Sequence, residues 1–66
     1  MAVAKTIEII SSSSESIDAA IRDGIAKASE TVKGIEGAWV QDTKVVVRDN
    51  RVTEWRVTLK ITFVVS

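Results

Sequence analysis

Few residues in this 66-residue chain have side chains suited to catalysis. The sequence contains no His and no Cys, which removes the commonest general base, the commonest zinc ligand and every thiolate site. Serines and carboxylates are present, but no Ser–Lys or paired-carboxylate arrangement lies in a recognisable pocket-forming loop. We therefore expect no catalytic residue, no metal ligand set within one subunit and no enzymatic activity.

The strongest candidate for ligand contact is the stretch KGIEGAWVQD, residues 33–42, which contains Trp39 two places after Gly37. Residues i and i+2 of a strand point to the same face, so these two positions share a face about 7 Å apart. Two explanations for the tryptophan stay open. It stacks against a planar ligand, or it anchors an interface between subunits, where aromatic residues concentrate.

Carboxylates offer a second kind of binding chemistry. Glu36, Asp42 and Asp49 carry the oxygen ligands that Ca²⁺ prefers. No EF-hand spacing connects them, and scattered loop carboxylates are usually solvated. A calcium site is therefore more plausible at a boundary between subunits than within one chain.

The elements that position these residues begin with a strand and a helix. Residues 4–10, AKTIEII, are rich in Ile and predict a strand. In the serine run that follows, Ser12 with Glu15 fits a capping box, and Ser13 is an equally good cap. From Ile17 to Ile35 the apolar residues recur at three- and four-residue steps, which predicts an amphipathic helix that stops at Lys33–Gly34. Gly24 lies on its apolar stripe, so we expect a close approach of helix to sheet there.

A hairpin is predicted for the second half of the chain. Residues 51–65 alternate between apolar and polar side chains over an unusual length. The apolar parity of residues 37–48 changes near Gln41–Thr43, which indicates a β-bulge. We predict a three-residue loop, Asp49–Asn50–Arg51, because it keeps the inner pairs apolar. The predicted pairs are Val47 with Thr53, Val45 with Trp55, Val40 with Leu59, and Ala38 with Ile61.

The expected architecture is a single α+β domain over residues 1–66 with the order β-α-β-β. One three-stranded antiparallel sheet is covered on one face by one helix, and Trp55 belongs to the core. The second face of the sheet holds Gly37, Trp39, Gln41, Arg56, Thr58, Lys60 and Thr62.

Composition limits the class of partner. Nine basic and nine acidic residues cancel, so nucleic acid and anionic membranes exert no strong attraction. The N-terminal residues do not resemble a signal peptide, and no apolar run is long enough to span a bilayer. We expect a soluble cytoplasmic protein. A chain this short, without disulfides and with 45% hydrophobic residues, is expected to self-associate.

The order of elements and two segments resemble the dodecin family. The segment TIEIISSSSESIDAAIRDGIAKASETV is similar to the family's first strand, serine-containing turn and Ala-rich helix. The segment VTEWRVTLKITF is similar to its last strand. The family's Gly-Thr-Ser turn is replaced by Ser11-Ser12-Ser13, and no gap is needed from Thr31 to Phe63.

The resemblance implies a hollow homododecamer with helices outside and sheets inside. Many dodecins bind stacked pairs of flavins against a tryptophan near the start of the second strand, and a polar residue of the last strand, usually Gln, contacts the flavin edge. Their role is understood as storage or photoprotection. This implies a non-catalytic flavin-binding protein, with FMN, FAD or riboflavin as its cofactor.

The sequence departs from the family at both positions that the resemblance points to. The stacking Trp falls on Gly37, and the Gln falls on Arg56. We predict that Trp39 is a relocated stacking platform, that Gly37 leaves room beside it, and that Arg56 and Gln41 complete the site, since a guanidinium is a strong donor to phosphate or to an electron-rich ring edge. The alternative is a dodecin-like cage without a flavin site, structural or binding calcium or another ion.

Overall fold

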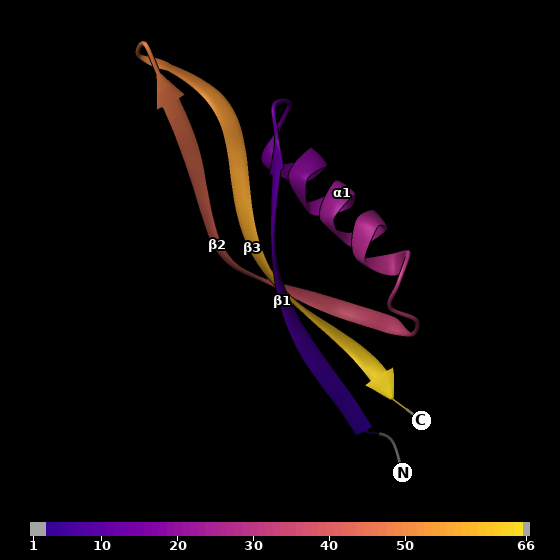
Figure 1. Cartoon of the computed structure of the whole chain (residues 1–66). Coiled ribbons are helices and arrows are strands. Elements are labelled where there is room, and N and C mark those ends of the chain that lie inside the picture. Colours follow the sequence, from indigo (N-terminus) through magenta and orange to yellow (C-terminus); the bar gives the residue numbers. More distant parts are fainter. Residues whose placement is uncertain (1–2, 66) are drawn as a thin grey trace.

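The computed structural model describes residues 3–65 and contains one helix and three strands in that range. The strands are β1 (Val3–Ser13), β2 (Ile35–Arg48) and β3 (Arg51–Val65), and the helix is α1 (Ile17–Ser29). The strands form one antiparallel sheet in the order β1-β3-β2, and α1 packs beside β1 and β3 (Figure 1). The predicted α+β class and β-α-β-β order are confirmed. No helix of the described residues is long and apolar enough to cross a membrane.

Strand β1 is longer than the sequence predicts. It pairs with β3 without a register shift from Val3 opposite Val65 to Ser13 opposite Trp55. Ser11, Ser12 and Ser13 therefore belong to the strand, and both predicted caps, Ser12 in a capping box with Glu15 and Ser13, are wrong. The central strand offers a partner for every residue up to Ser13, and these ladder bonds prevail over the capping preference of serine.

The helix begins after Ser16, which is its N-cap. Ser16 has extended backbone angles, and its Oγ accepts a hydrogen bond of 3.0 Å from the backbone N–H of Ala19. The helix ends at Ser29, earlier than the predicted stop. Gly34 has a φ of +75°, and its carbonyl accepts a 3.0 Å bond from the N–H of Val64. The chain has therefore already turned back onto β3 at Gly34, and Ile35 begins β2 instead of extending the helix.

Gly24 brings the helix close to the sheet, as predicted. A Cβ added at this position would lie 3.0 Å from Cβ of Ser11 and 3.2 Å from Cδ1 of Leu59. The buried core lies at this contact and consists of four residues, Ala20, Val57, Leu59 and Ile61.

The β2–β3 hairpin has a two-residue loop, so the predicted three-residue loop is wrong. Asp49 and Asn50 both have positive φ, at 50° and 63°, and Arg48 pairs with Arg51. Both residue types tolerate the left-handed region, which a tight two-residue loop requires twice. Next to the loop, the register shifts between Val46 and Val47.

This shift restores most of the predicted register. The predicted pair of Val47 with Thr53 is wrong, because Val47 pairs with Val52. The other three predicted pairs are confirmed: Val45 with Trp55, Val40 with Leu59, and Ala38 with Ile61. The predicted bulge is also confirmed, because the register shifts between Val40 and Asp42.

Strand β2 receives little cover from the helix. Val40, Val45 and Val47 are 39%, 44% and 56% exposed, although they lie on the side of the sheet that faces α1. Trp55, predicted to be core, is only half-buried and is not packed against the core. The cause is that one 13-residue helix covers β1 and β3, while β2 lies beyond its reach.

Candidate functional site

The face of the sheet opposite α1, called the open face here, is where the predicted site residues lie. The alternation of side chains and the strand register define it. The residues of the open face, besides Gly37, are Ala4, Thr6, Glu8, Ile10 and Ser12 of β1, Trp39, Asp42, Lys44 and Val46 of β2, and Glu54, Arg56, Thr58, Lys60, Thr62 and Val64 of β3.

Trp39 is the large aromatic residue of this face and is 63% exposed. It lies directly opposite Lys60, whose Nζ is 5.6 Å from the centroid of its ring. That distance is within the range of a cation–π interaction. One surface of the ring is thus covered by an ammonium group, and the side chain is otherwise largely open to solvent.

Lys60 is a candidate site residue that the sequence analysis places on the right face but does not single out. Its contact with Trp39 depends on the register of β2 against β3. The correct pairing of Val40 with Leu59 already implies that the next pair is Trp39 with Lys60. The signal was therefore present in the predicted register.

Gly37 lies opposite Thr62, and its surroundings are empty. A Cβ added to Gly37 would meet no heavy atom within 4 Å, and its φ is not in the positive region. Neither crowding nor backbone strain requires a glycine here. The position leaves a gap beside Trp39 that a flat group could occupy.

Arg56 lies further from this tryptophan, and Gln41 lies outside the regular strand pairing. Gln41 is the extra residue of the bulge and has no partner on β3, so Asp42 continues the open face in its place. Arg56 lies opposite Lys44, four residues along β3 from Lys60, which corresponds to about 13 Å. The structure groups Trp39 with Gly37 and Lys60, and it places Arg56 in a separate neighbourhood.

That second neighbourhood is a small hollow of about 220 Å³. The Nε of Arg56 lies 3.5 Å from Oε1 of Glu54, a partly exposed ion pair. Charges of both signs therefore meet around the guanidinium. The residues that line the hollow are Ile10, Asp42, Thr43, Lys44, Arg56 and Thr58.

The carboxylates considered as calcium ligands are spread along β2 and its loop. Glu36 lies at the start of β2, Asp42 at the bulge and Asp49 in the hairpin loop. Within residues 3–65, no three or more Asp, Glu, His or Cys side chains are grouped so that they could hold a metal ion. An ion site would need carboxylates from more than one subunit.

Comparison with known proteins gives a consistent result. The dodecin family model matches residues 3–66. The dodecin from Streptomyces davaonensis superposes with a TM-score of 0.94 at 29% identity, over 98% of this chain and 96% of that chain. A point variant of the Thermus thermophilus dodecin gives 0.95 at 26% identity, over 100% and 98%.

A third structure carries a different description. The calcium dodecin from Mycobacterium tuberculosis, described as a calcium-chelating antigen with a novel calcium-binding site, gives a TM-score of 0.82 at 27% identity. The match covers 92% of this chain and 87% of that chain. A search of curated proteins gave no significant match. The family match over nearly the whole sequence and the shared fold show that this chain belongs to the dodecin family.

Proposed function

We propose that this chain binds and sequesters a flavin, FMN, FAD or riboflavin, without catalysing a reaction, and that it does so as a hollow homododecamer in the cytoplasm. The observation that carries the proposal is the 63% exposed ring of Trp39 beside the empty space at Gly37. A large planar side chain and a gap next to it, on one face of a sheet, suit a flat aromatic ligand.

The energetics favour a planar ligand at this point. Stacking of a nucleobase on an aromatic side chain is worth about 1–3 kcal/mol, and an isoalloxazine offers a comparable flat surface. Lys60 already covers one surface of the ring. A ligand either displaces this ammonium group or stacks on the opposite surface of the indole.

Assembly is supported by the amount of apolar surface that one subunit leaves exposed. Trp39 at 63%, Ile10 at 71% and Val47 at 56% are examples, and the two edge strands, β1 and β2, each present unpaired backbone groups along their outer side. These side chains lie on both faces of the sheet, and a small chain that leaves so much apolar surface exposed is typical of a protein that self-associates. Both roles considered for Trp39 are satisfied if the ligand is enclosed where subunits meet.

The alternative is a dodecin cage without a flavin site that is structural or binds calcium or another ion. Two observations favour it: Gly37 and Arg56 stand where the resemblance implies Trp and Gln, and a relative of 27% identity is described as a calcium dodecin. The ion would have to lie between subunits, because residues 3–65 of one chain contain no suitable cluster.

A flavin titration followed by fluorescence separates the two proposals. Trp55→Phe leaves Trp39 as the single tryptophan, so the emission then reports on this ring alone. We expect saturable quenching of tryptophan and flavin emission in the wild type and in Trp55→Phe, and its loss in Trp39→Ala. Quenching that survives in Trp39→Ala, or no quenching in an intact assembly, would contradict the flavin proposal. A rise in melting temperature with Ca²⁺ that chelation reverses would favour the alternative.

A further inference from the structure

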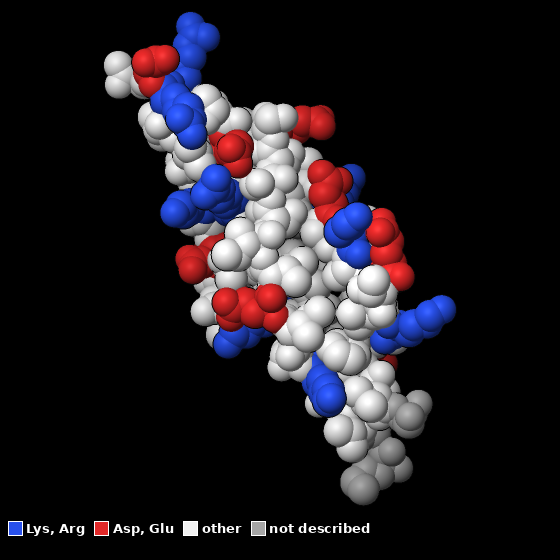
Figure 2. Space-filling model, in the orientation of Figure 1, with Lys and Arg blue, Asp and Glu red and all other residues white. Residues whose placement is uncertain are grey.

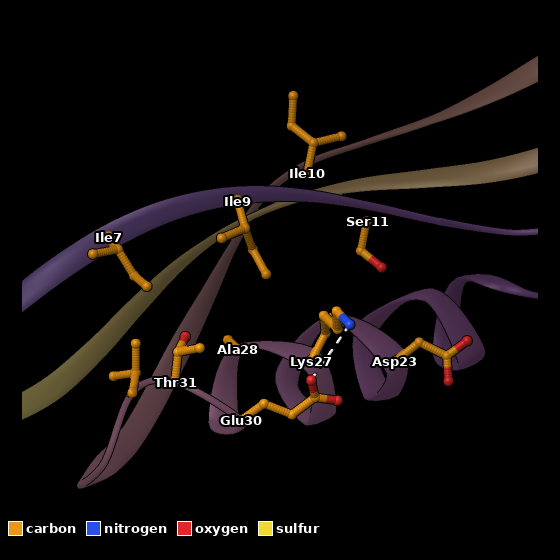
Figure 3. Close-up of a pocket in the computed structure, with 11 residues that line it drawn as sticks. Ile7, Ile9, Ile10, Ser11, Asp23, Lys27, Ala28, Glu30 and Thr31 are labelled. Carbon is orange, nitrogen blue, oxygen red and sulfur yellow. Dashed lines mark ion pairs between the residues drawn. The ribbon is translucent and has the colours of Figure 1, made fainter.

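Three side chains of the open face stand in one row across the sheet. Lys60 of the central strand lies opposite Glu8 of β1 on one side and opposite Trp39 of β2 on the other. Figure 3 shows the alternation of β1 that places Glu8 on this face: Ile9 points toward α1, whereas Ile10, two residues from Glu8, points away from it. The row therefore contains a carboxylate, an ammonium group and an aromatic ring, in that order.

The ammonium group of Lys60 has two partners within its reach and contacts one of them. Directly opposite residues have Cβ atoms about 4.5–5.5 Å apart, and the flexible stem of a lysine spans this distance. In the structure, Nζ lies 5.6 Å from the centroid of the Trp39 ring. Within residues 3–65, Lys60 forms no ion pair, and the side chain of Glu8 is exposed.

A hollow lined by both Glu8 and Lys60 leaves room for the ammonium group to move between the two partners. It has a volume of about 190 Å³ and is lined by Thr6, Ile7, Glu8 and Lys60. The other neighbours of Glu8 on the open face are uncharged; they are Thr6 and Ile10 along β1, and Thr58 and Thr62 diagonally on β3. Among the described residues, Lys60 is therefore the cation that the strand register places beside Glu8.

The two contacts open to Lys60 have similar strengths. An exposed ion pair and an exposed cation–π contact each contribute weakly to stability, so neither holds the lysine firmly. The chain has no net charge, and acidic and basic side chains are interspersed on the side of the molecule in Figure 2, so no broad field of one sign overrides these contacts there. A ligand that binds better to one arrangement of the lysine than to the other therefore shifts the lysine.

We propose that Glu8 is a positioning residue for ligand binding at Trp39: it receives the ammonium group of Lys60 and so frees the surface of the ring on which a planar ligand stacks. With Lys60 on the ring this surface is closed, and with Lys60 paired to Glu8 it is open. The apparent affinity is the intrinsic affinity multiplied by the fraction of open sites. The inference rests on the proposed flavin binding and deepens it, since it commits the ligand to the surface of Trp39 that Lys60 covers.

Riboflavin titrations of four proteins test this role: the wild type, Glu8→Gln, Lys60→Met and the double variant. Glu8→Gln removes the charge and keeps the size of the side chain. We expect it to bind riboflavin about 2- to 5-fold more weakly than the wild type, in line with the loss of one cross-strand charge pair. In the Lys60→Met background the same substitution should change the affinity little, because no ammonium group covers the ring.

Glu54→Gln is the matched control. It removes a carboxylate from the same face, six residues along β3 from Lys60, which corresponds to about 20 Å, and it should leave the riboflavin affinity unchanged. Equal affinities of the wild type and Glu8→Gln would overturn the inference and would indicate stacking on the opposite surface of the indole. An equal loss of affinity in both backgrounds would also overturn it, because Glu8 would then act without Lys60.

A measurement without ligand separates this inference from the flavin proposal. Protein labelled with ¹³C-lysine gives an NMR signal for the Cε methylene of Lys60, which is identified by its absence in Lys60→Met. An aromatic ring moves the proton resonances of a group above its face upfield. We expect this upfield shift to grow in Glu8→Gln, where the lysine loses its second partner, and to vanish in Trp39→Ala.

The two measurements fail in different ways. An upfield shift that is the same in Glu8→Gln and the wild type would show that the lysine does not visit Glu8, and it would overturn the inference whatever the titration gives. A wild type that binds no riboflavin, with a shift that grows in Glu8→Gln, overturns the flavin proposal and leaves the movement of Lys60 between Glu8 and Trp39 in place.

Discussion

At the scale of single residues, the proposed ligand binding depends most on the pair of Trp39 and Lys60. The ammonium group 5.6 Å from the ring centroid protects one surface of the indole. Such a contact is worth about 0.5–1 kcal/mol at an exposed site. A ligand that stacks on this surface must first displace the lysine.

Removing Lys60 therefore has a defined consequence. With riboflavin, which carries no phosphate, we expect Lys60→Met to bind about 2- to 5-fold more tightly, since the cation–π contact no longer competes. Isothermal titration calorimetry measures the change, and Lys33→Met, outside the strands, is the control. Weaker binding by Lys60→Met would show that the lysine holds the ligand instead of competing with it.

Gly37 allows a gain-of-function prediction. An added Cβ would meet no heavy atom within 4 Å and the φ of Gly37 is not positive, so the position accepts a side chain without backbone strain. We expect Gly37→Trp to bind flavin about 5- to 150-fold more tightly, in line with about 1–3 kcal/mol per stacked aromatic group. Ala38→Trp, whose ring would project to the opposite face, should give no gain. Equal affinities of both variants would contradict a ligand on the open face.

At the scale of the elements, the position of the helix depends on its first residue and on Gly24. Ser16 satisfies an otherwise unpaired N–H at the start of α1. Ser12, which the sequence predicts as a cap, lies in β1 opposite Arg56 instead. These two serines differ in role although they are of the same type and lie four residues apart.

Two alanine substitutions distinguish them. Ser16→Ala should lower the free energy of unfolding by about 1 kcal/mol, the usual effect of losing an N-cap, whereas Ser12→Ala should change it little. Chemical denaturation of both variants at one protein concentration provides the comparison. A larger loss of unfolding free energy in Ser12→Ala than in Ser16→Ala would show that Ser12 caps the helix, as the sequence pattern predicts.

Gly24→Ala tests the close approach of helix and sheet. Alanine favours the helix by up to about 1 kcal/mol, but its Cβ would lie 3.0 Å from Ser11 Cβ, and overpacking typically costs about 1–3 kcal/mol. We expect a net loss of about 1 kcal/mol and a lower melting temperature. Ala26→Gly, on the exposed side of α1, measures the helix propensity alone. A higher melting temperature for Gly24→Ala would contradict the tight contact.

The elements also show how far the sequence could predict the structure. Periodicity located α1 and the strands, and parity located the bulge at Gln41, because both depend on which side chains face the core. Parity did not determine the loop: a two-residue loop with a bulge at Thr53 and a three-residue loop both pair Val45 with Trp55. The limits of β1 were mispredicted because they depend on β3 as a partner and not on local preference.

The candidate site was predictable in part for the same reason. The shared face of Trp39, Gly37 and Lys60 follows from alternation and register. The separation of Arg56 from Trp39 follows from the register as well, but Gln41 depends on the detail of the bulge. Sequence patterns assign residues to faces better than they assign distances along a face.

At the scale of the whole molecule, one subunit is an incomplete structure. Its extents are 52 × 19 × 13 Å, and within residues 3–65 the buried hydrophobic core contains four residues. Val45 and Val47 of β2 and the open face with Trp39 are left exposed. In the proposed function, assembly and ligand binding would both cover apolar surface that the single chain exposes.

Native mass spectrometry of the wild type and Trp39→Ala, each with and without FMN, tests the central claim most directly, because one spectrum reports both subunit number and bound ligand. We predict a dodecamer for both proteins, with mass increments of FMN on the wild type and none on Trp39→Ala. A wild-type monomer, or an intact dodecamer that takes up no FMN, would contradict the claim that this dodecin sequesters flavin at Trp39.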